Sequence, residues 1–95
     1  GIDMAKAVTI IVTDPVGLYA TPATELVDTM KTFSSDIQLE YESKSVNMKS
    51  LMGVLSLGIP CKATIKVEAS GDDEEAVIES VIKKMTELSI GKVQP

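Results

Sequence analysis

The chain has 95 residues, of which 44% are hydrophobic and 24% are charged, and its net charge is −5. This length fits one domain that can bury a hydrophobic core without the support of disulfide bonds or a structural metal ion. The composition is that of an ordered protein. With 9 basic against 14 acidic residues, and no apolar run near the ~20 residues of a membrane span, we expect neither nucleic acid nor a membrane among its partners.

Side chains that perform catalysis or bind metals are scarce. The chain has no histidine, which removes the commonest general base and metal ligand and excludes Ser-His or Cys-His nucleophilic catalysis. Its one cysteine, Cys61, has no disulfide or CxxC partner, so we expect a small buried residue in a reduced, cytoplasmic setting. The acidic run at 72–75 lacks the spacing of a calcium loop. We therefore expect a non-catalytic protein without metal or cofactor.

The hydrophobic pattern predicts alternating strands and helices. In chain order these are a strand at 6–13, a helix of about three turns ending near 33, a hairpin of strands 37–41 and 44–47, a short helix at 50–57, a strand at 63–69 and a helix at 73–88. This order, βαββαβα, predicts an α+β domain at 4–90, with helices on one side of an antiparallel or mixed sheet. Residues 1–3 are interpreted as an artificial addition and 91–95 as a C-terminal tail.

The stretch from Asp14 to Ala23 joins the first strand to the first helix and is one candidate site. Gly17 permits a tight turn, and Pro22 fits the first turn of a helix. Tyr19 or Thr21 would then lie beside unpaired backbone N–H groups, a geometry that attracts phosphate. A connection without any binding role would explain the same residues.

The short helix at 50–57 is the second candidate. Ser50 is a plausible N-cap, and Gly58 and Pro60 end the helix. Its apolar residues are too many for one helix face: Leu51, Met52, Val54, Leu55 and Leu57. We expect some of them to form an exposed contact surface, although a sheet could instead bury them all.

Two segments, in this order, resemble motifs of the HPr family, the small phosphocarrier proteins of the bacterial sugar phosphotransferase system. They are GLYATPA at 17–23 and the closer match, VNMKSLMGVLSLG at 46–58. Together with the element order, the likeness covers nearly all of 4–88. It implies an open-faced β-sandwich, a four-stranded antiparallel sheet with three helices on one face.

In that family a histidine at the start of the first helix carries the phosphoryl group, with an arginine two residues on. Those positions hold Tyr19 and Thr21 here, although Gly17 and Ala20 of the motif remain. A phenol with a pKa of ~10 is a poor nucleophile without a base, and its phosphate ester is a poorer donor than phosphohistidine. Thr21 has no charge and cannot bind a phosphate through two parallel hydrogen bonds as arginine does. We therefore expect no phosphate relay toward sugars, with Tyr19 filling a disused site.

The family's second site is a serine that a dedicated kinase phosphorylates, and Ser50 occupies that position. Phosphate would add about −1.5 to −2 charges beside Leu51, Met52 and Leu55, which a partner could recognise. The resemblance implies as partners an HPr serine kinase, a catabolite-repressor transcription factor and phosphotransferase components. One branch, the catabolite-repression HPr-like proteins, also lacks the histidine and keeps the serine, but it retains the arginine that Thr21 replaces.

Three functions are therefore compatible with the sequence. The first, which we favour, is a regulatory binding module switched by phosphorylation of Ser50. The second is a phosphoryl acceptor or carrier that uses Tyr19 or Ser50, and the third is a paralogue with an unrelated partner, in which Ser50 is only an N-cap. Metal chaperones and acylphosphatases share a similar element order, but they need paired cysteines or an arginine, and this chain has neither.

Overall fold

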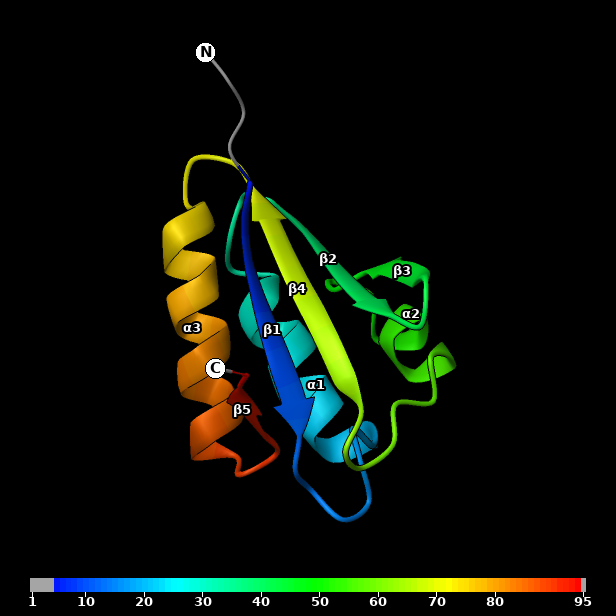
Figure 1. The fold of residues 1–95 in the computed structure, drawn as a ribbon. Coiled ribbons are helices and arrows are strands. Elements are labelled where there is room, and N and C mark those ends of the chain that lie inside the picture. Colours follow the sequence, from blue (N-terminus) through cyan, green and yellow to red (C-terminus); the bar gives the residue numbers. More distant parts are fainter. Residues whose placement is uncertain (1–4, 95) are drawn as a thin grey trace.

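One antiparallel sheet forms the frame of the computed structural model, which describes residues 5–94 (Figure 1). The expected addition at 1–3 lies outside the described residues. The elements are β1 (Lys6–Val12), α1 (Ala20–Met30), β2 (Asp36–Tyr41), β3 (Lys44–Asn47), α2 (Leu51–Ser56), β4 (Thr64–Ser70), α3 (Glu74–Glu87) and β5 (Gly91–Val93). The strand order is β3-β2-β4-β1-β5, so the predicted α+β fold and the hairpin are confirmed.

The strands bury one face and expose the other. Val8 and Ile10 of β1 face the same side as their partners Val67 and Ile65 of β4, and all four are buried. Side chains at the alternate positions of β4, such as Lys66, are exposed, as the period of two requires. The helices cover the buried face, which gives the open-faced sandwich: Figure 1 shows α1 behind β1 and β4, α3 next to them and α2 near β3.

The helices supply the second layer of the core. The apolar residues of α1 fall at helical spacing, and its buried side chains are Pro22, Ala23, Leu26, Val27 and Met30. On α3 the buried stripe is Val77, Val81 and Met85, while Ile78, Ile82 and Leu88 pack around it partly exposed. Within residues 5–94, none of the helices is both long and apolar enough to cross a membrane.

The sheet has five strands rather than the expected four, because the predicted tail contains a strand. Gly91–Val93 pairs with the outer edge of β1, and Gln94 N donates to Thr9 O at 2.9 Å. A Cβ on Gly91 would lie 2.9 Å from Ile10 Cγ2, so this position allows only a very small residue. Three residues that include a glycine carry no alternating pattern, and only the long-range pairing defines the strand.

The connection between α1 and β2 is fastened to the start of α3 by one carboxylate. Asp73 accepts hydrogen bonds from the backbone N–H groups of Ser34 and Ser35, at 2.8 and 3.0 Å, and from both serine hydroxyls. The Ser35 hydroxyl, followed by the Ser34 backbone, lowers the pKa of Asp73 to about 2. The Asp73 side chain makes no capping hydrogen bond to α3, so its role is this contact with Ser34 and Ser35.

The hairpin turn stores backbone strain. Glu42 and Ser43, the two residues between β2 and β3, have φ angles of 50° and 68°. Both lie in the left-handed region that Asn-Gly turns adopt readily and that other residues enter at a cost.

Replacing Ser43→Gly should therefore raise the free energy of unfolding by about 1 kcal/mol, because glycine enters the left-handed region without strain. Urea denaturation would measure the change. Ser45→Gly, on the adjacent strand, is the matched control and should destabilise the fold. A Ser43→Gly variant no more stable than the parent would contradict the strain argument.

The second prediction concerns acid stability. The folded-state pKa of Asp73, about 2, lies below its ordinary value of 3.8, so its contribution to stability is present above pH 3.8 and is lost as the pH falls through about 2. The parent should lose more stability than Asp73→Asn between these two pH values, as measured by urea midpoints. Asp72→Asn, at the exposed neighbour, should behave like the parent, and an identical pH profile for Asp73→Asn and the parent would refute this role.

Candidate functional site

The first candidate site lies at the start of α1. Tyr19 is the N-cap residue in extended conformation, and its side chain makes no capping hydrogen bond. The phenol side chain is 41% exposed, and Thr21 is exposed as well. Ala20 and Thr21 place their N–H groups in the first helical turn, where no intrahelical acceptor exists. Pro22 is buried and has no N–H to satisfy.

Gly17 holds the loop before α1 against the segment that follows α2. Its φ is +93°, and a Cβ there would collide with the Ile59 carbonyl oxygen and lie 2.8 Å from Pro60 Cα. The next residue, Leu18, donates its N–H to Ile59 O at 2.9 Å. Val16 N donates to the Asp14 carboxylate at 2.8 Å and tightens the same turn. The closeness of the two backbones explains why a glycine is required.

The second candidate site lies at the start of α2. Ser50 is the N-cap residue, half-buried, and its Oγ accepts a hydrogen bond from Gly53 N at 3.1 Å. Ser50 O accepts from Val54 N at 3.0 Å, and Ser50 N donates to Asn47 O at 3.0 Å. A Cβ on Gly53 would lie 3.3 Å from Ser50 Oγ, so the glycine leaves room for the serine side chain.

The apolar residues of α2 are divided between the core and the surface. Val54 is buried and Leu51 packs against the core, whereas Met52 is 84% exposed and Leu55 38% exposed. The alternative that the sheet buries all of them is therefore wrong. A six-residue helix has too few turns to direct its four apolar side chains inward.

Exposed apolar side chains gather on α2 and on the loop before α1. Of the five large apolar side chains exposed among residues 5–94, four belong to these two segments: Val16, Tyr19, Met52 and Leu55. The helices α1 and α2 contact each other, and Gly17 contacts Ile59 just after α2, so the two segments are neighbours. We call these four residues the apolar surface, since exposed groups of this kind mark contact sites.

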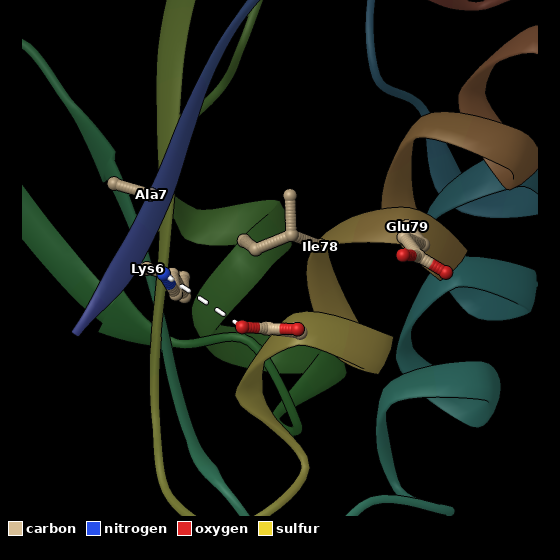
Figure 2. Close-up of a pocket in the computed structure, with 5 residues that line it drawn as sticks. Lys6, Ala7, Ile78 and Glu79 are labelled. Carbon is tan, nitrogen blue, oxygen red and sulfur yellow. Dashed lines mark ion pairs between the residues drawn. The ribbon is translucent and has the colours of Figure 1, made fainter. Parts of the chain in front are cut away.

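The remaining polar features are potential metal ligands, a cysteine and an ion pair. Within residues 5–94, no group of three His, Cys, Asp or Glu side chains could hold a metal ion. Cys61 is half-buried rather than fully buried, with Sγ 3.9 Å from Thr13 O. A hollow of about 250 Å³ lies between β1 and α3, and Lys6 pairs there with Glu75 at 3.8 Å. Figure 2 shows the residues that line it. Both partners are exposed, so this ion pair contributes little stability.

Comparison with known proteins identifies the family. A family model described as the PTS HPr component phosphorylation site matches residues 6–87. The chain belongs to the HPr family. Its members named in these comparisons are phosphocarrier or catabolite-repression proteins, so the expected family and fold are confirmed.

Three solved HPr-family structures illustrate the likeness. The histidine-containing phosphocarrier protein of Mycoplasma is 31% identical, with a TM-score of 0.88 over 95% of this chain and 100% of that one. HPr-C-His from Thermoanaerobacter tengcongensis is 44% identical, with a TM-score of 0.79 over 82% and 88%. Crh, the Bacillus subtilis catabolite repression HPr, is 33% identical, with a TM-score of 0.64 over 85% and 94%.

Some residues around this HPr-family site were missed by the sequence analysis. Val16 is an apolar residue inside a turn between proline and glycine, and that placement could have indicated exposure. Lys49, directly before Ser50, donates through Nζ to the Phe33 carbonyl oxygen at 2.8 Å. No pattern in the sequence indicates this contact, because the two residues are distant in the chain.

The close approach at Gly17 predicts that alanine costs more stability there than at Gly58. Gly17→Ala should lower the free energy of unfolding by about 2–4 kcal/mol, because it adds a backbone collision to the left-handed φ. Gly58→Ala also has a left-handed φ, +58°, but no atom within 4 Å, and should cost about 1 kcal/mol. Urea denaturation of both variants measures the difference, and equal losses would contradict the collision.

Proposed function

We propose that this HPr-family chain is a regulatory binding module of the bacterial cytoplasm, switched by phosphorylation of Ser50, and that it does not relay phosphoryl groups toward sugars. The observation that carries the proposal is Tyr19. It is the N-cap of α1, where the family resemblance expects the phosphoryl-carrying histidine, and none of the 95 residues is a histidine. A phenol lacks the reversible nitrogen–phosphorus chemistry that a relay needs, and no neighbouring imidazole can act as its base.

The surroundings of Ser50 support its role as the switch. Its hydroxyl lies on the same short helix as the exposed Met52 and Leu55. A phosphate would add about −1.5 to −2 charges at the rim of this apolar surface. A partner with a matching apolar patch and a basic group would distinguish the two forms of the protein.

The proposed partners follow from the family. They are an HPr serine kinase, a catabolite-repressor transcription factor and components of the phosphotransferase system. The likeness to a catabolite repression HPr supports the repressor among them. Thr21, which offers no charge, weakens any contact that depends on an arginine at that position.

A second function is favoured by the exposure of Tyr19. Its phenol is 41% exposed and makes no capping hydrogen bond, so it is accessible to a phosphoryl donor. In that case the protein would be a phosphoryl acceptor at Tyr19 or Ser50. A third function, an unrelated protein partner, would use the apolar surface without any switch.

Labelling with two donors separates these functions. The chain would be incubated with an HPr serine kinase and ATP, and separately with the first phosphotransferase enzyme and phosphoenolpyruvate. We expect phosphate on Ser50 from ATP alone, since only this hydroxyl lies in the motif that the kinase recognises within the family. Ser50→Ala should lower the labelling to background, and Ser56→Ala, at an exposed serine of the same helix, should leave it unchanged.

Two results would contradict the regulatory proposal. Stable label on Tyr19 from phosphoenolpyruvate would support the acceptor function instead. Identical partners captured by Ser50→Ala and Ser50→Asp would show that position 50 does not act as a switch.

A further inference from the structure

Lys49 connects the residue before the proposed switch to the end of another helix. It lies between β3 and α2, and its partly buried Nζ donates to Phe33 O at 2.8 Å. Phe33 follows α1, and its N–H donates to Met30 O at 3.2 Å, so it belongs to the turn that ends that helix. The two residues are 16 positions apart in sequence, which makes this a tertiary contact.

The contact places a positive charge in the turn that follows α1. The last carbonyl groups of a helix have no intrahelical donor and carry partial negative charge. The last turn of α1 contains no basic residue, and its C-cap residue, Lys31, is exposed. The Lys49 ammonium, which comes from a different segment, ties the turn after α1 to the residue before Ser50.

A phosphate on Ser50 would compete for the same ammonium group. A hydrogen bond from an ammonium to a dianionic phosphate is roughly twice as strong as a bond between neutral groups, and a neutral carbonyl is the weaker acceptor. The flexible lysine stem can turn toward the adjacent residue. The chain contains no arginine, so a lysine must supply any cation from this chain that pairs with the phosphate.

We propose that Lys49 leaves the Phe33 carbonyl and pairs with the phosphate when Ser50 is phosphorylated, so that the modification loosens the C-terminal end of α1. This inference rests on the proposed phosphorylation of Ser50. Its consequence is an internal response in addition to the new surface charge. The loosening of the α1 end should not extend to Ser34 and Ser35, because Asp73 holds these residues at the start of α3 through separate hydrogen bonds.

The test uses the full chain with phosphoserine placed at position 50 during translation, beside the unmodified chain. We expect the Phe33 carbonyl ¹³C resonance to move and its amide hydrogen exchange to become several-fold faster in the phosphorylated chain. Lys49→Met should show fast exchange in both forms. Lys44→Met, at an exposed lysine of β3, is the control and should respond as the parent does.

The phosphate itself provides a second measurement. In a ³¹P titration, the second pKa of the phosphoserine should be about half a unit lower in the parent than in Lys49→Met, because a nearby cation favours the dianion. An unchanged Phe33 resonance on phosphorylation, or equal phosphate pKa values in the two chains, would overturn the inference. Because no kinase is used, either failure would leave the proposed function standing, and a failed kinase reaction would not affect this contact.

Discussion

The close approach of Gly17 to the Ile59–Pro60 backbone is the constraint on which the rest of the site depends. It presses the loop before α1 onto the segment after α2, and the Leu18 hydrogen bond to Ile59 fastens the two. The start of α1 and the segment that follows α2, which are far apart in sequence, are therefore neighbours.

The two sites have different chemical capacities within one HPr-family frame. At the first, Tyr19 and Thr21 at the start of α1 offer neither an imidazole nor a positive charge. At the second, Ser50 keeps a hydroxyl beside exposed apolar residues. A protein that lacks phosphate-transfer groups at the first site but has a hydroxyl beside exposed apolar residues at the second is suited to recognition by partners. We therefore propose regulation rather than phosphate transfer.

The connection at 33–35 links the second site to the remaining helices. Phe33 accepts from Lys49, the neighbour of Ser50, while Ser34 and Ser35 donate to Asp73 at the start of α3. These bonds join the ends of three helices through polar groups, outside the apolar core. A charge added at Ser50 would therefore act on a network that already depends on the placement of one ammonium and one carboxylate.

The sequence by itself determined the order of the first seven elements, the buried stripes of α1 and α3, the hairpin, and the residues at both helix starts, because local periodicity and turn-forming residues encode these features. Only the tertiary structure decided the fifth strand, the division of α2 into buried and exposed side chains, and the contacts of Gly17, Lys49 and Asp73. Each of these depends on pairing or packing between segments distant in the chain. Such contacts leave no periodic pattern in the residues that make them.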